Sequence, residues 1–340
     1  MKKEKQDNLL ESQKIVKNLT GHFESDKKLL IRGIESLRAK NAAFEEVKML
    51  GIALYKLLLD NGLNESDVIN QDRLYNKIDG FVYNNQETTA LDILTVLDAI
   101  SPYEKFDGKN VRVYCFENQI EARIFEEDGV VVRDFSWLES PRPNLLATKA
   151  KIYLDMGKNT EALAAVKEIL EINPVSFTAH LLEAQVYREK NPKKFKEILK
   201  RAAQYAYTPQ HFVQLFQNYY HYYLTKEDYV TAYAVLSAVK IYEVNDGLLD
   251  ELEALKQKMN RTVVTPFKVP SAEQIMQILE KENIEVQISV KNYAILIELY
   301  KTQFETQENK ALIKKLAEYI QGFAGQEDVL KIIEKKLKNK

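Results

Sequence analysis

Histidine and cysteine are the residue types from which metal binding or proton transfer would first be expected. The sequence has 4 histidines: His22, His180, His211 and His221. No two of them have the i, i+4 spacing, with a glutamate, that places two zinc ligands on one helical face. Cys115 is the single cysteine, so neither an intramolecular disulfide nor a cysteine-based metal cluster can form. We expect no metal site.

Motifs for nucleophilic catalysis or nucleotide binding are absent from the sequence. There is no G-x-S-x-G turn to present a serine, and no G-x-x-x-x-G-K-[ST] or G-x-G-x-x-G loop to hold phosphates. We therefore expect a protein that is not an enzyme and uses no cofactor. One alternative stays open: an enzyme site hidden within residues 63–140, which a pocket of convergent polar groups with perturbed pKa values would indicate.

Two acidic stretches have the composition of cation sites without their pattern. In Asp60–Asp67, Glu65 stands where the EF-hand loop needs its sixth-position glycine, and no bidentate glutamate follows at the twelfth. We expect a turn between helices there. The acidic residues 126–128 fall at the tip of a predicted hairpin, where carboxylates are solvated. Cys115 alternates with strand neighbours on an apolar face, which favours a buried side chain over a reactive thiol.

Tyrosines are concentrated between residues 205 and 242. Tyr220 and Tyr223 fall at helix-packing positions. Tyr219 and Tyr222 are harder to assign to one core face, and could line a groove where a ring stacks and its hydroxyl donates. The sole tryptophan, Trp137, is expected to fill the junction before the next helix, with ligand stacking as the alternative.

A helical hairpin between residues 143 and 176 is the clearest of the elements that would position these side chains. The pattern predicts helices over Leu145–Met156 and Thr160–Glu171, which meet at Gly157 and end at Asn173–Pro174. One hairpin cannot bury its apolar face alone, so it needs similar hairpins beside it.

Two further hairpins follow at nearly the same interval. Ala150 and Tyr153 recur 34 residues later as Ala184 and Tyr187. The third hairpin repeats the pattern through Phe216, Tyr220, Tyr223, Asp228, Tyr229, Ala232, Leu236 and Val239. This recurrence resembles the tetratricopeptide repeat, whose period is about 34 residues. The resemblance covers residues 143–246 and implies a mainly α fold built around an α-α superhelix, or solenoid.

In proteins that this pattern resembles, the first helix of each repeat lines a concave groove that holds an extended peptide or a partner helix. Carried over by position, the groove would include Ala147, Thr178, Leu181 and the residues of the predicted binding site: Asn144, Lys151, Gln185, Arg188, Gln214, Gln217, Asn218 and His221. Amides can bond a peptide backbone, and Lys151 and Arg188 can pair with an acidic group. The alternative is that these are solvated helix faces.

The rest of the chain is expected to form three other regions. Residues 1–62 form an N-terminal helical region, and residues 63–140 a mixed region with helices at Ser66–Ile78 and Glu87–Ile100. That region also contains a three-stranded antiparallel β meander over residues 111–116, 120–125 and 130–135, with a turn at Asp128–Gly129. The repeats occupy 143–260, followed by a linker at Arg261–Pro270. Residues 271–340 are expected to form helical hairpins that continue the solenoid: Ala272–Glu282, Ser289–Gln303, Asn309–Phe323 and Gln326–Lys338.

Composition limits the classes of partner. The chain has 340 residues with a net charge of −2, so it has no basic surplus for nucleic acid. No apolar run approaches the 18 residues of a membrane span, and the charged start lacks a signal-peptide core. We expect a cytoplasmic, non-enzymatic scaffold that binds a protein or peptide in its groove. The alternative is a peptide-sensing regulatory protein whose N-terminal region acts on an effector.

Overall fold

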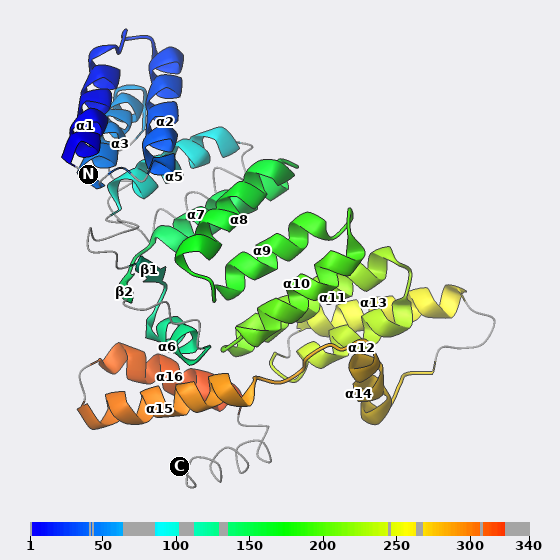
Figure 1. Cartoon of the computed structure of the whole chain (residues 1–340). Helices are drawn as coiled ribbons and strands as arrows, with labels where there is room; N and C mark the ends of the chain where they lie inside the picture. Colours follow the sequence, from blue (N-terminus) through cyan, green and yellow to red (C-terminus); the bar gives the residue numbers. More distant parts are fainter. Residues whose placement is uncertain are drawn as a thin grey trace. The chain divides into compact units, whose positions relative to one another are not determined.

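The computed structural model describes residues 2–40, 42, 44–63, 86–101, 112–128, 135–243, 246–262, 268–306 and 309–323. Four predicted features lie wholly or largely outside them: the helix at residues 66–78, the strand at 130–135 with its turn at 128–129, the linker at 261–270 and the helix at 326–338. The fold is mainly helical, as predicted (Figure 1). The chain divides into two compact units. Compact unit 1 is Met1–Ala122 with Gly129–Pro174, and compact unit 2 is Arg123–Asp128 with Val175–Lys340.

The described residues at the start of compact unit 1 form four helices around a shared apolar core: α1 (Lys2–Lys17), α2 (Phe23–Ala39), α3 (Phe44–Asp60) and α5 (Glu87–Ile100). Helix α3 packs against the other three. Its Leu50, Leu54 and Leu58 recur at helical spacing and are buried. Gly51 lies so close to α5 that an added Cβ would be 2.7 Å from the Cβ of Ala99. A glycine there therefore allows α3 and α5 to pack closely.

The predicted antiparallel meander is wrong. The described residues contain a two-stranded sheet, in which β1 (Arg112–Phe116) and β2 (Phe135–Glu139) pair in parallel with Tyr114 opposite Trp137. Parallel strands cannot be joined by a tight turn and need a crossover connection. The ring of Trp137 lies 6.1 Å from that of Phe116.

A helix replaces the predicted middle strand. Helix α6 (Gln119–Glu127) follows β1, and Asn118 caps its start by accepting hydrogen bonds from the backbone N–H groups of Ile120 and Glu121. Residues 120 and 124 are spaced by four as well as by two, so the same apolar residues satisfy a helical period and an alternating one. The capping side chain favours the helix.

The first predicted hairpin is present as α7 (Arg142–Asp155) and α8 (Asn159–Ile172), which pack against each other. Its turn has Gly157 at φ +71°, a conformation that glycine adopts without strain. Ala150 and Ala162 are both fully buried, so small residues stand where the two helices meet.

Compact unit 2 contains two more helix pairs, α9 (Phe177–Tyr187) with α10 (Pro192–Gln204), and α11 (Pro209–Thr225) with α12 (Tyr229–Val239). All four helices have a capping side chain that accepts a hydrogen bond from the first turn, supplied by Ser176, Asn191, Thr208 and Asp228. The adjacent packed pairs are consistent with an α solenoid.

Four later helices of compact unit 2 lie in the described part of the chain: α13 (Asp246–Thr262), α14 (Ala272–Lys281), α15 (Val290–Thr306) and α16 (Lys310–Gly322). Helices α13 and α14 pack on α12, and α15 pairs with α16. Phe323 is 1% exposed and meets the rings of Phe212, Tyr242 and Tyr293 edge-on. The end of α16 thus shares a core with α11.

Asn292 adds a polar link from α15 to the end of α10. Its side chain is fully buried, and its amide donates to the backbone oxygens of Gln204 and Ala206, both at 2.9 Å. These carbonyls follow the last turn of α10 and lack partners within the helix. The amide therefore satisfies the carbonyl of Ala206, which would otherwise be buried unpaired, and also binds the partly buried carbonyl of Gln204.

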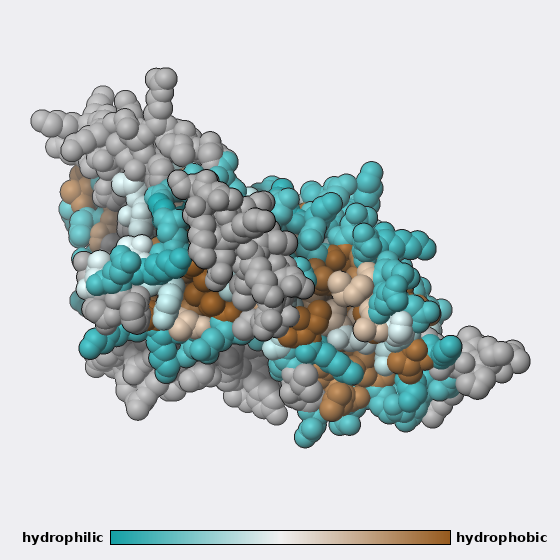
Figure 2. Space-filling model, turned by 90° about the horizontal axis from the view of Figure 1, so that it is seen from below, coloured by the Kyte–Doolittle hydropathy of each residue, from teal (hydrophilic) through white to brown (hydrophobic). Residues whose placement is uncertain are grey.

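On the face shown in Figure 2, apolar residues gather in more than one place, each bordered by polar residues. Large apolar side chains that remain exposed include Val230, Val269 and Met276 of compact unit 2. Helices of the length and apolarity needed to cross a lipid bilayer are absent from the described part of the chain.

Candidate functional site

Two of the predicted binding residues, Gln185 on α9 and Asn218 on α11, are hydrogen-bonded to each other. The Gln185 amide donates to Asn218 Oδ1 at 3.2 Å, and the Asn218 amide donates to the backbone oxygen of Gln214 at 2.9 Å. The two residues are 33 positions apart, nearly one repeat, so equivalent positions of successive hairpins lie side by side. Asn218 is only 7% exposed. Its side chain is therefore better placed to orient Gln185 than to contact a ligand.

Arg188 and His221 form a second pair of equivalent positions, three residues further along the chain: Arg188 directly follows the end of α9, and His221 lies on α11. The His221 side chain is exposed. Partial desolvation and then the positive charge of Arg188 lower its pKa, and the negative charge of Glu251 on α13 acts to raise it. Among the described residues the Arg188 guanidinium forms no ion pair, and Gln217 nearby on α11 is exposed. We call this surface the α9–α11 face: Gln185, Arg188, Gln214, Gln217, Asn218 and His221.

The two remaining predicted binding residues belong to compact unit 1. Asn144 and Lys151 lie on α7 and are exposed, whereas Ala147 between them is buried. Within the described residues the Lys151 ammonium forms no ion pair. They are accessible side chains of the first hairpin, and the hydrogen-bonded contact of the α9–α11 face does not involve them.

Of the side chains that could have done nucleophilic or acid–base chemistry, Cys115 is enclosed in the core and His211 is half-buried. Cys115 is fully buried and unpaired, and burial raises the pKa of its thiol to about 11. His211 stacks on Phe177 with ring centroids 4.0 Å apart, and desolvation lowers its pKa to about 3. No group of three potential metal ligands occurs among the described residues.

The clustered tyrosines are core residues. Tyr219 and Tyr222, the two considered for a groove, are 4% and 9% exposed. Tyr222 stacks on Phe195 with centroids 5.2 Å apart. Tyr223 donates its hydroxyl to Glu282 at 2.5 Å, which fixes the end of α14 against α11. They stabilise compact unit 2 and line no described groove.

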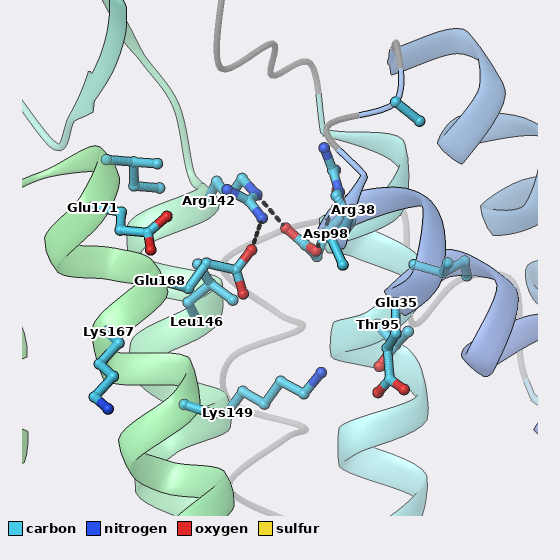
Figure 3. A pocket seen from close by; sticks show the side chains of 15 residues that line it. Glu35, Arg38, Thr95, Asp98, Arg142, Leu146, Lys149, Lys167, Glu168 and Glu171 are labelled. Atoms are coloured by element: carbon cyan, nitrogen blue, oxygen red, sulfur yellow. Dashed lines mark hydrogen bonds and ion pairs between the residues drawn. The ribbon is translucent and has the colours of Figure 1, made fainter. Parts of the chain in front are cut away.

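A charged pocket in compact unit 1 was not predicted from the sequence. Its volume is about 420 Å³, and its lining includes four cationic and four anionic side chains: Arg38, Arg142, Lys149, Lys167, Glu35, Asp98, Glu168 and Glu171. Helices α2, α5, α7 and α8 supply its walls (Figure 3). We call this cavity the charged pocket.

Arg142 is the fixed centre of the charged pocket. Its side chain is 1% exposed, and it forms ion pairs with Asp98, at 2.7 Å from Nε to Oδ1, and with Glu168 (Figure 3). Arg38 also donates to the backbone oxygen of Asp98 at 2.6 Å. Because a buried unpaired charge is costly, this network holds both carboxylates in place.

The cationic groups of the charged pocket keep Asp98 ionised. Burial acts to raise the pKa of Asp98, but the charges of Arg142 and Arg38 outweigh it and leave that pKa below 3.8. Asp98 is therefore ionised at neutral pH. A general acid or base needs a pKa near the working pH, which this carboxylate does not have.

A buried glutamate next to β1 was also not predicted. Glu121 is 2% exposed and accepts hydrogen bonds from the backbone N–H of Glu117 at 2.9 Å and from the Asn173 amide at 2.7 Å. Burial, and then the neighbouring Glu117, raise its pKa. Glu121 thus ties the start of α6 to the end of α8.

Comparison with known proteins found nothing similar: no protein-family model, no curated protein and no solved structure matches the chain. The resemblance to tetratricopeptide repeats therefore stays a prediction, and function has to be argued from the two surfaces described above.

Proposed function

We propose that the protein is a non-enzymatic, tetratricopeptide-like scaffold that binds a peptide or protein segment carrying an acidic group. The observation that carries this proposal is the hydrogen bond between Gln185 and Asn218. It shows that the first helices of two successive hairpins meet at equivalent positions, the arrangement on which the groove assignment depends.

The α9–α11 face has the chemistry for such a ligand. Arg188 offers five N–H donors in a planar fork that matches a carboxylate, and no acidic residue of the described chain occupies it. Gln217 is exposed and can donate to or accept from an extended peptide backbone. Lys151 of the first hairpin is 34 residues before Gln185 and occupies the equivalent position in the repeat.

Selection from a random peptide library against the full chain tests the proposal. We expect the selected peptides to share an acidic residue, and their affinity to fall with increasing salt because the pairing charges are partly solvated. Arg188→Ala should weaken binding by about tenfold, since one charge-assisted contact contributes about 1.4 kcal/mol.

Arg32→Ala is the matched control, because Arg32 is an exposed arginine on α2 with no ion pair among the described residues. It should bind the selected peptides as the wild type does. Selection of peptides without acidic residues, or equal affinity of the Arg188→Ala variant at unchanged melting temperature, would contradict the proposal.

A further inference from the structure

The charged pocket contains two ammonium groups that form no ion pair within the described residues. Lys149 on α7 is half-buried and Lys167 on α8 is exposed, and within the described residues neither ammonium forms an ion pair. Figure 3 shows Lys149 reaching from α7 toward α5. Ammonium groups at the edge of a cavity are donors available to an anionic group of a ligand.

Acceptors for a cationic group lie beside these donors. Arg142 engages Oδ1 of Asp98 and Oε1 of Glu168, so each carboxylate retains a second oxygen. Asp98 Oδ2 forms an ion pair with Arg38 Nε at 3.7 Å, a distance too long for a hydrogen bond, so this oxygen can still accept a hydrogen bond from a ligand. The Glu168 side chain is 40% exposed, and its Oε2 accepts no hydrogen bond from the described residues.

The overall charge of the lining selects the kind of ligand. The lining side chains comprise four cations and four anions, so a ligand with a large net charge of either sign would meet as much repulsion as attraction. A ligand that carries one positive and one negative group can satisfy both sets at once. The cavity of about 420 Å³ is within the range of small-molecule sites, roughly 300–1,000 Å³.

We propose that the charged pocket binds a small zwitterion of the amino-acid class, whose ammonium lies against Asp98 and Glu168 and whose carboxylate lies against Lys149, since the Lys167 side chain extends away from Lys149 (Figure 3). Arg142 is a positioning residue: it orients the two acidic side chains without contacting the ligand. This site belongs to compact unit 1 and does not rest on the peptide-binding role proposed for the α9–α11 face.

The test uses the full chain and isothermal titration with each of the protein amino acids in turn. We expect at least one to bind at millimolar concentration or below. An alkylamine and an alkylcarboxylate of matched size, each lacking one of the charges, should bind at least about tenfold more weakly.

Variants then assign the two halves of the site. Lys149→Met and Glu168→Gln should each weaken binding by about tenfold or more, and Glu168→Gln keeps an oxygen that can accept from Arg142. Lys158→Met, at an exposed lysine in the α7–α8 turn, should bind like the wild type. The proposal is overturned if no amino acid binds, if the singly charged analogues bind equally well, or if the Lys149→Met variant keeps full affinity.

Discussion

Replacing Arg142 by methionine should destabilise compact unit 1 by about 3 kcal/mol, the lower end of the cost of breaking a buried ion pair. Methionine keeps most of the apolar stem of a side chain that is 1% exposed, so little cavity is created. The loss comes from Asp98, whose side chain is 16% exposed and, among the described residues, retains an ion pair with Arg38 alone. Glu168 is 40% exposed and regains water.

Urea unfolding followed by the fluorescence of Trp137 measures this loss, because the sole tryptophan lies in compact unit 1. Adding Asp98→Asn should recover about half of the stability by removing the stranded charge. The pKa of Asp98 is held below 3.8, so the stability due to the pair is present above that pH and is lost as the pH falls below it. The wild type and the Arg142→Met variant should therefore converge in acid.

The matched control is Arg32→Met, which should stay within about 0.5 kcal/mol of the wild type. The reasoning is refuted if Arg142→Met costs less than about 1 kcal/mol. If Asp98→Asn fails to recover stability in the double variant, the loss is due to packing and the charge argument is wrong.

Three other predictions concern the cores of the two compact units. Asn292→Ala should lower the free energy of unfolding by about 1–3 kcal/mol, since it leaves the buried carbonyl of Ala206 without a donor. Urea unfolding followed by circular dichroism measures this loss, and a loss under about 0.5 kcal/mol would contradict the prediction. Gly51→Ala should lower the free energy of unfolding by about 1–2 kcal/mol, because the clash of the added Cβ with the Cβ of Ala99 at 2.7 Å outweighs the gain of about 1 kcal/mol in helix propensity. A higher melting temperature of this variant would show that α3 and α5 can move apart without cost. The pKa of His211 is lowered to about 3, so its side chain stays neutral in the fold; its contribution to stability is complete above about pH 6.5 and is lost as the pH falls toward 3. The His211→Phe variant should therefore show a flatter pH dependence of stability between these two pH values. An unchanged slope would exclude the histidine as the source of the pH dependence.

The helices were predictable where local chemistry and periodicity agreed. Gly157 marks the turn of the first hairpin, and its φ of +71° shows why a glycine is found there. The β region was predicted wrongly because Ile120 and Ile124 satisfy two periods at once. The cap supplied by Asn118 was the local signal for a helix.

The two candidate surfaces differed in how much of them the sequence could indicate. Gln185 and Asn218 were placed on one face by a repeat of nearly constant length, and their hydrogen bond agrees with that placement. The charged pocket could not be foreseen, because Asp98 and Glu168 stand 44 and 26 residues from Arg142. Their convergence depends on how α5, α7 and α8 pack, and nothing in local spacing encodes it.

The parallel pairing of β1 with β2 affects the order in which the chain can fold during synthesis. The strand at Arg112–Phe116 finds its partner only after residues 135–139 have left the ribosome, and the intervening segment has to close as a loop first. A hairpin such as α7–α8 closes over a much shorter separation and forms faster. Before β2 is synthesised, the backbone N–H and C=O groups of β1 have no partner strand and can pair with strands of other chains. The nascent chain should therefore be most prone to misassociation when synthesis has passed β1 but not β2.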